Sequence, residues 1–328
     1  MTENLPQTHH AVTIDQPGGP DGLTWSEVPV PQPGPGQVLV RTAAAGLNFI
    51  ETYQRSGVYD VDYPFTPGSE GSGTVVALGE GVEGVEVGDR VATAAGTGTY
   101  AEHFVAPAEQ LLPVPEQMDL QQAASVPLQG MTAHYLCRST VEVGPDHTVL
   151  IHAGAGGVGL LLTQLCVSLG ATVITTASTK AKRELSRQAG AAHVLEYEGF
   201  AEKVRELTDG QGVDVVYDGV GKDTFDASLE SLRVRGTLVL FGGSSGQVPP
   251  FDLQRLNGAG ALYVTRPSLA FYTRTAEETA WRAGELFEAI AAGTLDLRIG
   301  AQHPLAEAGR AHADLEERKT TGKVLLVP

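Results

Sequence analysis

The stretch that decides the fold is Val149-Leu150-Ile151-His152-Ala153-Gly154-Ala155-Gly156-Gly157-Val158-Gly159. An apolar run leads into Gly154, Gly156 and Gly159, which fit the pattern G-x-G-x-x-G, and a helical pattern follows them. Glycines at this spacing let the chain turn tightly and let its backbone approach a pyrophosphate, while the next helix offers unpaired N–H groups. The pattern alone is a weak signal, because a glycine-rich turn can also serve the structure only, so the surrounding sequence must decide.

Around this stretch, apolar and helical segments alternate between residues 146 and 265, which is typical of a parallel sheet buried on both faces. The predicted strands are Thr148–Ala153, Thr172–Ala177, His193–Leu195, Val213–Asp218, Thr237–Gly242 and Ala261–Thr265. Helices are predicted at Val158–Leu169 and Lys180–Ala189, and the glycine after each one, Gly170 or Gly190, suits a helix end. Six strands with five right-handed crossovers make the full set of a dinucleotide-binding fold, so the glycine pattern predicts a cofactor site.

The chain before about residue 130 has a different rhythm, in which short β-type runs are separated by Gly and Pro. Examples are Gln37–Arg41, Gly73–Leu78 and Asp89–Ala92. This spacing predicts a partly closed β structure with helical insertions. After about residue 270, we predict a helix over Thr275–Ala292 and a short strand over Lys323–Val327, which we expect to return to the first domain. The predicted domains are therefore residues 1–128 with 271–328, and residues 129–270.

Composition excludes several classes of protein. The 328 residues suit two domains, and 22 Lys and Arg against 39 Asp and Glu give a net charge of −17, which repels nucleic acids. No run approaches the ~20 apolar residues of a membrane span. The first six residues also lack the pattern of a signal peptide, so we expect a soluble, cytoplasmic protein. Cys137 and Cys166 stand among apolar residues, without the spacing of a disulfide framework or a zinc site, and are expected to be inert.

The segment after the second predicted strand indicates which dinucleotide is bound. An acidic side chain there would accept the ribose hydroxyls of NAD. The chain instead reads Ala177-Ser178-Thr179-Lys180-Ala181-Lys182-Arg183, which contains no carboxylate. A serine and three basic residues can donate hydrogen bonds to a 2′-phosphate, so NADPH is favoured over NADH. The alternative is that these basic residues form only the solvated face of a helix.

Three further motifs carry a family resemblance. They are Gly46-Leu47-Asn48-Phe49-Ile50-Glu51-Thr52-Tyr53-Gln54-Arg55-Ser56-Gly57-Val58-Tyr59, Gln129-Gly130-Met131-Thr132-Ala133 and Leu315-Glu316-Glu317-Arg318-Lys319-Thr320-Thr321-Gly322-Lys323. In this order around the glycine loop, they resemble the zinc-independent quinone oxidoreductases, the ζ-crystallin relatives of the medium-chain dehydrogenase/reductase superfamily. The resemblance covers the chain from about residue 10 to its end. It implies an α/β protein in which a partly open, GroES-like β-barrel forms the catalytic domain and a six-stranded Rossmann domain binds NADPH.

The resemblance also bears on metals. Zinc-dependent alcohol dehydrogenases of the same superfamily carry a catalytic cysteine where this chain has Asn48, and Gly-His-Glu where it has Gly68-Ser69-Glu70. Amide and hydroxyl groups are poor zinc ligands, and the four-cysteine lobe of those relatives is missing as well, so we expect no metal. Reduction needs no metal when the acceptor is already electrophilic, as quinones are, and is held against the nicotinamide.

The resemblance further implies roles for individual residues. Asn48 and Tyr53 would hydrogen-bond the quinone or the nicotinamide side of the site, with Tyr59 and Gln129 lining it and Thr132 near the nicotinamide amide. The remaining cofactor contacts would come from the loop residues Gly154, Ala155, Gly156, Gly157, Val158 and Gly159, from the 2′-phosphate residues Ser178, Lys182, Tyr197 and Arg318, and from the later strand ends Val220, Phe241, Gly242, Ser244 and Arg266. Without the resemblance, Tyr53 and Tyr59 would be core or rim aromatics and Arg318 a surface charge.

Three hypotheses for function follow. The first is NADPH-dependent reduction of quinones by a homodimer, paired through the edge strand Ala261–Thr265, with one- and two-electron transfer both left open. The second is NADPH-dependent reduction of activated C=C bonds, because enones and quinones are both conjugated carbonyls. The third is a nucleotide-dependent RNA-binding protein, which the net charge of −17 disfavours.

Overall fold

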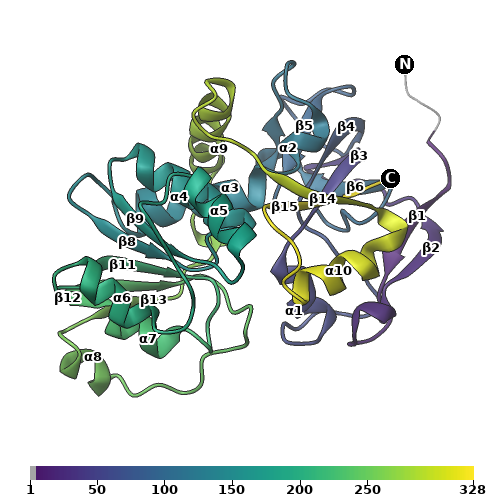
Figure 1. Cartoon of the computed structure of the whole chain (residues 1–328). Coiled ribbons are helices and arrows are strands. Elements are labelled where there is room, and N and C mark those ends of the chain that lie inside the picture. The colour runs from purple at the N-terminus through teal and green to yellow at the C-terminus, as the bar shows by residue number, and fades with distance from the viewer. Residues whose placement is uncertain (1–4) are drawn as a thin grey trace. The chain divides into compact units, whose positions relative to one another are not determined.

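The computed structural model describes residues 5–328, which form two compact units (Figure 1). Within the described residues, the first unit consists of residues 5–128, Thr275–Gly284 and Ile299–Pro328. The second unit consists of Gln129–Arg274 and Glu285–Arg298. The prediction that the chain lacks a signal peptide rests partly on Met1–Asn4, and these four residues lie outside the residues that the structure describes. No helix within residues 5–328 has the length and apolar character needed to cross a bilayer.

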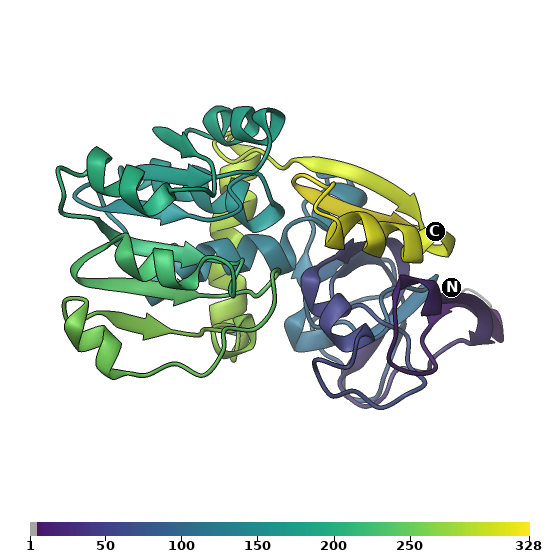
Figure 2. The ribbon, with the colours of Figure 1, turned by 60° about the horizontal axis from the view of Figure 1, so that its bottom comes forward.

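A six-stranded parallel sheet forms the centre of the second unit, and its strands stay side by side in both views (Figures 1 and 2). The strand order is β10-β9-β8-β11-β12-β13, and every neighbouring pair is parallel. The strands are β8 (Thr148–Ile151), β9 (Thr172–Thr176), β10 (His193–Leu195), β11 (Val213–Asp218), β12 (Leu232–Leu240) and β13 (Tyr263–Thr265). The predicted parallel sheet is confirmed. Because the order reverses between β8 and β11, their carboxyl ends are where such sheets bind ligands.

Helices connect these strands in turn: α4 (Gly157–Ser168), α5 (Lys180–Gln188), α6 (Phe200–Leu207), α7 (Phe225–Glu230) and α8 (Gln254–Gly258). Another helix, α3 (Pro127–Tyr135), precedes the first strand. After α4 and α5, Gly170 and Gly190 have φ angles of 88° and 101°, in the left-handed region that glycine adopts without strain. Their role in ending the two helices is confirmed.

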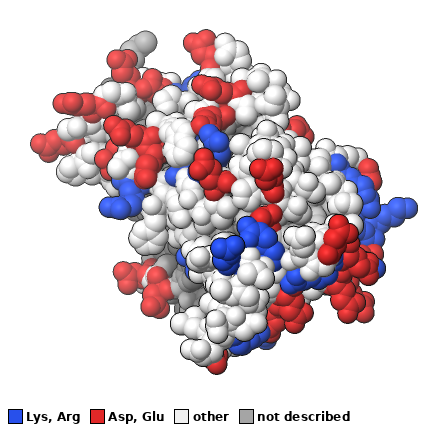
Figure 3. All heavy atoms as spheres, turned by 90° about the vertical axis from the view of Figure 1, so that its left-hand side faces the viewer, with Lys and Arg blue, Asp and Glu red and all other residues white. Residues whose placement is uncertain are grey.

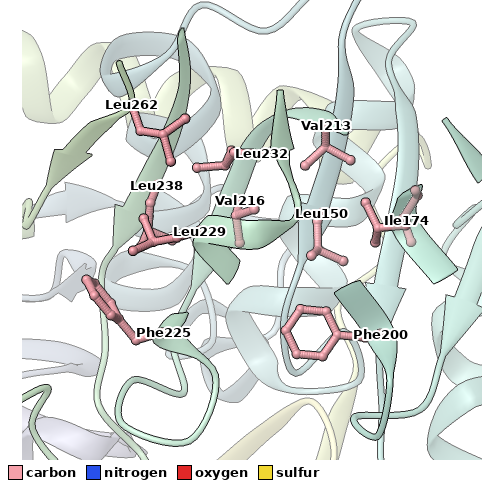
Figure 4. Close-up of a cluster of buried hydrophobic side chains, with 11 residues drawn as sticks. Leu150, Ile174, Phe200, Val213, Val216, Phe225, Leu229, Leu232, Leu238 and Leu262 are labelled. Atoms are coloured by element: carbon pink, nitrogen blue, oxygen red, sulfur yellow. The ribbon is translucent and has the colours of Figure 1, made fainter. Parts of the chain in front are cut away.

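One core cluster of the second unit lies between the sheet and the pair α6 and α7, which contact one another. Figure 4 shows the apolar side chains that meet there, which come from the strands and from both helices: Leu150, Ile174, Phe200, Val204, Val213, Val216, Phe225, Leu229, Leu232, Leu238 and Leu262. Every one of them is at least nine-tenths buried. Apolar burial on this scale is the main force that holds a parallel sheet together.

The first unit contains an open, seven-stranded sheet in the order β14-β15-β3-β4-β5-β7, with β6 also paired to β3, and a separate pair of strands, β1 and β2. The strands are β1 (Thr8–Thr13), β2 (Thr24–Pro29), β3 (Gln37–Leu47), β4 (Gly71–Leu78), β5 (Arg90–Thr93), β6 (His103–Pro107), β7 (Leu112–Pro113), β14 (Ile299–Pro304) and β15 (Lys323–Val327). The helices are α1 (Phe49–Arg55), α2 (Leu120–Ala123) and α10 (Ala308–Glu316). As predicted, the terminal strand returns here: β15 pairs antiparallel with β3 and parallel with β14.

The predicted division of the chain needs a correction. Residues 271–274 and 285–298, which the sequence prediction put in the first domain, belong to the second unit, so that α9 (Ala276–Ala291) contributes to both. The reason is tertiary: Glu285 lies 2.9 Å from His134 and accepts a hydrogen bond from Arg138, while the backbone N–H of Asp296 donates to Gln164. These partners are far apart in sequence, and composition does not reveal such pairs.

Several strand boundaries also differ from the prediction: β8, β9 and β12 end one or two residues earlier than predicted, and two strands begin elsewhere. β12 begins at Leu232, before the predicted Thr237, and β13 begins at Tyr263 instead of Ala261. Ala261 has a φ of 55°, which is incompatible with an extended strand.

Candidate cofactor site and substrate segment

The glycine loop joins β8 to α4. Its turn is fixed by backbone hydrogen bonds from Gly154 N–H to the carbonyl oxygen of Thr176 (2.9 Å) and from Gly156 N–H to that of Ala153 (2.8 Å). A Cβ atom on Gly159 would lie 2.2 Å from the Ala153 carbonyl oxygen, so this glycine is required by the protein's own backbone. At Gly156 the nearest atom would be 3.2 Å away, and φ is −77°, a value any residue adopts. The protein's own backbone therefore restricts position 156 less severely than position 159.

The first turn of α4 presents open backbone donors. Gly156 is its N-cap and supplies no side-chain oxygen, so the first N–H groups and the positive end of the helix dipole are available to an anion. Ala155 is buried beside them, and Val158 is half-buried. Loop and helix together form a cradle that fits a pyrophosphate.

Two predicted residues from α3 belong to the same unit as this loop. The side chain of Gln129 lies against Gly157, where an added Cβ would come within 1.8 Å of Gln129 Oε1. Thr132 is buried one turn further along α3. The structure thus brings Gln129 to the glycine loop, a placement that the sequence motif does not reveal.

A buried polar chain, missed by the sequence prediction, links three strand ends at this edge of the sheet. His152 Nδ1 lies 2.8 Å from Thr176 Oγ1, and His152 Nε2 lies 2.9 Å from Ser228 Oγ, which donates to the carboxylate of Asp218 (3.1 Å). That carboxylate also accepts the backbone N–H of Val220 (2.8 Å). Burial lowers the pKa of His152, so its imidazole stays neutral. These hydrogen bonds fix the ends of β8, β9 and β11 relative to one another.

The loops after β11 and β12 pack against each other closely. Ser244 N–H donates to the Gly219 carbonyl oxygen (3.2 Å), and a Cβ on Gly242 would lie 2.7 Å from that same oxygen. The guanidinium of Arg266 donates to the carbonyl oxygen of Phe241 (3.1 Å). Four predicted cofactor residues therefore lie together at the carboxyl end of the sheet, on the side of β13.

The predicted 2′-phosphate residues of the second unit follow β9 and β10, which are neighbours in the sheet. Ser178 is exposed directly after β9, and Lys182 stands in the first turn of α5. The hydroxyl of Tyr197 accepts the N–H of Ala153 at the start of the glycine loop (3.2 Å). Arg183 pairs with Glu196 (2.9 Å), which the sequence could not show.

Arg318 was predicted to join this group. It belongs to the first unit, where it is exposed just beyond the end of α10. Its contact with a cofactor stays a prediction.

The segment predicted to bind substrate forms α1 and the turn after it. Tyr53 is half-buried on α1, and its ring centroid lies 5.4 Å from that of the exposed Tyr59 and 6.3 Å from that of Phe49. The N–H groups of Val58 and Tyr59 both donate to the Tyr53 carbonyl oxygen, which holds the turn against the helix. The result is a small aromatic surface on the first unit, with Tyr59 open to solvent.

Asn48 lies at the start of α1 and is 96% buried, since only 4% of its surface is exposed. Its amide nitrogen donates to Glu70 (2.8 Å), and its amide oxygen accepts from the ammonium group of Lys323 (2.9 Å). The carboxyl group of Glu51 accepts the backbone N–H of Asn48. The pKa of Glu51 is raised to about 8, mainly by burial. The sequence prediction left Lys323, Glu70 and Glu51 out of the site. The burial of a charged side chain leaves no local signal in the sequence.

Metal ligands are not grouped in residues 5–328: no three His, Cys, Asp or Glu side chains of this part lie together as an ion would require. Cys137 and Cys166 are free, buried thiols. The pKa of Cys166 is well above its ordinary value, first because of its hydrogen bond with Cys137 and then because of burial. A thiol of this kind is unreactive.

Two parts of the chain match known protein families. Residues 34–116 match the family model of the alcohol dehydrogenase GroES-like domain, and residues 157–282 match that of the zinc-binding dehydrogenase. A quinone oxidoreductase of Pseudomonas aeruginosa is 46% identical over 95% of this chain and 97% of its own length. A 2-haloacrylate reductase of Burkholderia sp is 42% identical over 97% of this chain and 98% of its own length.

Among solved structures, a mycobacterial protein complexed with NADPH is 54% identical to this chain. It covers 97% of this chain and 100% of its own, with a TM-score of 0.96.

Proposed function

The chain belongs to the quinone oxidoreductases of the medium-chain dehydrogenase/reductase superfamily, and we propose that it reduces quinones with NADPH. The observation that carries this proposal is the glycine loop, which leads into a helix whose first N–H groups have no side-chain cap and are available to an anion. We assign cofactor binding to the second unit and quinone binding to the first. When bound, NADPH supplies the reducing equivalents.

In the second unit, the residues have separable roles. The loop from Gly154 to Gly159 and the first turn of α4 bind the pyrophosphate with backbone N–H groups. Ser178, Lys182 and Tyr197 bind the 2′-phosphate. Thr132 and Gln129 orient the nicotinamide end, and the strand-end residues line the remaining length of the cofactor: Val220, Phe241, Gly242, Ser244 and Arg266.

In the first unit, Tyr53 and Tyr59 bind the flat quinone ring by stacking and hydrogen bonding. The hydroxyl of Tyr53 donates a hydrogen bond to the charge that develops on the quinone oxygen, and solvent supplies the final proton. Asn48 positions the start of the same segment, because its side-chain amide is hydrogen-bonded to Glu70 and to Lys323. We propose that the reaction is independent of zinc: amide and hydroxyl groups are poor ligands, and the Lys323 ammonium between Asn48 and Glu70 would repel a metal cation.

Steady-state assays with simple quinones test the function, with NADPH compared against NADH. We expect a preference of about tenfold or more for NADPH, as one charge-assisted hydrogen bond to the 2′-phosphate would give. Turnover with NADH alone would remove the basis for the phosphate site. An enzyme that leaves quinones unreduced with either nucleotide would contradict the proposal as a whole.

Reduction of activated C=C bonds is the second candidate, favoured by the 42% identity to a 2-haloacrylate reductase. Tyr53→Phe separates the two. For a quinone reductase we expect about a tenfold loss of turnover with quinones and a similar loss with enones, because only one hydrogen bond to developing charge disappears. A large loss confined to enones would identify Tyr53 as a proton donor and favour the second candidate. Tyr272→Phe, which removes a hydroxyl bonded to Thr140 in the second unit, is the matched control.

We also propose that the enzyme is a homodimer, joined through the edge strand β13. Among residues 5–328, this strand pairs with β12 alone, and its Tyr263 and Val264 are 61% and 38% exposed, which leaves an apolar edge open to a second copy. Light scattering at micromolar concentration should give twice the mass of the 34.4 kDa chain, and Val264→Lys should return it to a single chain. A wild-type protein that scatters as one chain would contradict the dimer.

The surface charge of the protein bears on nucleic-acid binding. Figure 3 shows one face of the molecule on which Lys and Arg are interspersed with Asp and Glu, without a continuous basic stripe. Together with the net charge of −17, this supports an enzyme that does not bind nucleic acid.

The free thiols Cys137 and Cys166 suit a reducing compartment, in keeping with the proposed cytoplasmic location.

A further inference from the structure

Lys323, in the last strand, lies inside the first unit instead of on its surface. Only 3% of it is exposed, although Lys is almost never buried without a partner. Its ammonium group donates to a carboxylate oxygen of Glu70, to the amide oxygen of Asn48 (2.9 Å) and to the Leu47 carbonyl oxygen (3.4 Å). Three acceptors match the three N–H donors of an ammonium group, so Lys323 is fully satisfied.

The same contacts extend to the start of α1. Asn48 is the N-cap of this helix, and its amide nitrogen donates to Glu70 (2.8 Å) and to the carbonyl oxygen of Gly46 (3.3 Å). The second carboxylate oxygen of Glu70 accepts the backbone N–H of Leu128 (2.7 Å). The ammonium group of Lys323, the carboxylate of Glu70 and the amide of Asn48 are therefore joined in a ring of hydrogen bonds. This ring lies at the start of α1, the helix that carries Tyr53.

This ring has no spare room. A Cβ on Gly46 would lie 2.2 Å from Glu70 Oε2 and 2.7 Å from Lys323 Nζ, so the ring packs against bare backbone of β3. A buried ion pair alone contributes little stability, because desolvation offsets the attraction between its charges. What the geometry does provide is a fixed position and orientation for the Asn48 side chain.

The neighbouring charged groups agree with this picture. Glu51 is completely buried at α1, and its raised pKa of about 8 leaves it mostly uncharged at pH 7. It therefore does not compete strongly with Glu70 for the single ammonium group. Arg55, also on α1, is paired with Glu316 (2.7 Å) and hydrogen-bonded to His312 (3.2 Å). Glu70 is thus the carboxylate that Lys323 holds.

We propose that Lys323 is a positioning residue for quinone reduction: through Asn48 and Glu70, its ammonium group holds the segment from Asn48 to Tyr59 in the geometry that the reaction needs. The proposal rests on the proposed function of that segment. Lys323 touches neither the quinone nor the cofactor in this scheme.

The first test is Lys323→Met, which keeps the apolar stem and removes the charge. We expect kcat for quinone reduction to fall by about 10- to 100-fold, as displacement of reacting groups by a fraction of an ångström to 1 Å would cause. The dissociation constant of NADPH, measured by fluorescence titration, should change by less than about twofold, a difference of only ~0.4 kcal/mol. Lys319→Met is the matched control, because that ammonium group is 62% exposed and pairs only with Asp314 and Glu317. It should behave as the wild type.

The second test separates positioning from simple charge balance. In the double variant Lys323→Met/Glu70→Gln, no buried charge is left unpaired, so the melting temperature should return towards the wild-type value. Turnover of quinone should stay low, because Asn48 has still lost its lysine donor. If the double variant regains both stability and turnover, Lys323 only neutralises Glu70 and the proposal is overturned. Full quinone turnover in the single variant overturns it as well.

Hydrogen–deuterium exchange gives a readout that needs no enzymatic activity. In the double variant, backbone amides of residues 48–59 should exchange faster than in the wild type, while the glycine loop of the second unit should not change. Unchanged exchange at residues 48–59 would contradict the positioning role. A wild-type protein that reduces no quinone would count against the proposed function instead, and exchange would still decide whether Lys323 holds the segment.

Discussion

Gly156→Ala is expected to raise the dissociation constant of NADPH by about 10- to 100-fold, equivalent to ~1.4–2.7 kcal/mol, with a smaller fall in melting temperature than Gly159→Ala causes. Substitution of a glycine usually disturbs the protein through strain or through a clash. Backbone strain does not apply here, because Gly156 has an ordinary φ of −77°. Its added Cβ would lie 3.2 Å from the Ala153 carbonyl oxygen, a tight contact that a shift of a few tenths of an ångström relieves. A ligand that approaches the backbone at this point would also meet the methyl group.

The other loop glycine, Gly159, provides the contrast. Its added Cβ would come within 2.2 Å of the Ala153 carbonyl oxygen, so Gly159→Ala should lower the melting temperature as well as the affinity. Gly258→Ala in α8 is the control for a harmless substitution in the same unit, since nothing lies within 4 Å of its added Cβ. Isothermal titration with NADPH and thermal melting measure the two quantities. Unaltered NADPH affinity in Gly156→Ala would mean that no dinucleotide crosses this loop.

Ser178→Asp is expected to reverse the cofactor preference. We expect kcat/KM with NADPH to fall by about 100-fold or more, because a carboxylate placed beside the 2′-phosphate adds like-charge repulsion of a few kcal/mol. With NADH the value should stay constant or rise, since the same carboxylate can accept hydrogen bonds from the ribose hydroxyls. Ser178 is exposed at the end of β9 and its substitution disturbs no packed side chain.

The control for this change is Ser168→Asp, which adds the same charge to an exposed serine of the second unit, at the end of α4. Its kinetics with both nucleotides should match the wild type. Equal losses with NADPH and NADH in Ser178→Asp would show a structural effect and no phosphate site. Assays at several salt concentrations add a further check, because repulsion between charges weakens as ionic strength rises.

Much of the second unit could be predicted because its signals are local. The apolar segments, the glycine pattern and the glycines that end α4 and α5 each act through the backbone of a few neighbouring residues. The family and the pair of folds, a partly open β structure and a Rossmann-type sheet, were predicted from these segments and motifs and are confirmed. The boundary near α9 was wrong in part, because the second half of that helix is held by Glu285 through His134 and Arg138, more than a hundred residues away.

The candidate site likewise has some residues that the sequence could place and some contacts that it could not show. The sequence placed Ser178, Lys182 and the loop glycines near one another, since residues that follow neighbouring parallel strands meet at one edge of the sheet. It could not show that Gln129 lies on Gly157, or that His152, Ser228 and Asp218 form one buried chain. Hydrogen bonds between distant side chains leave no periodic trace in the sequence.

By itself, the sequence determined the parallel sheet with its glycine loop, the open β structure before it and the absence of a carboxylate after β9, since each depends on residues that are close along the chain. Only the tertiary structure decided what Asn48 and Lys323 do. They are 275 residues apart and are joined because β15 pairs with β3. A lysine near the end of a chain normally lies in water. Its burial here follows from the strand pairing, which carries its ammonium group to a carboxylate and an amide inside the first unit.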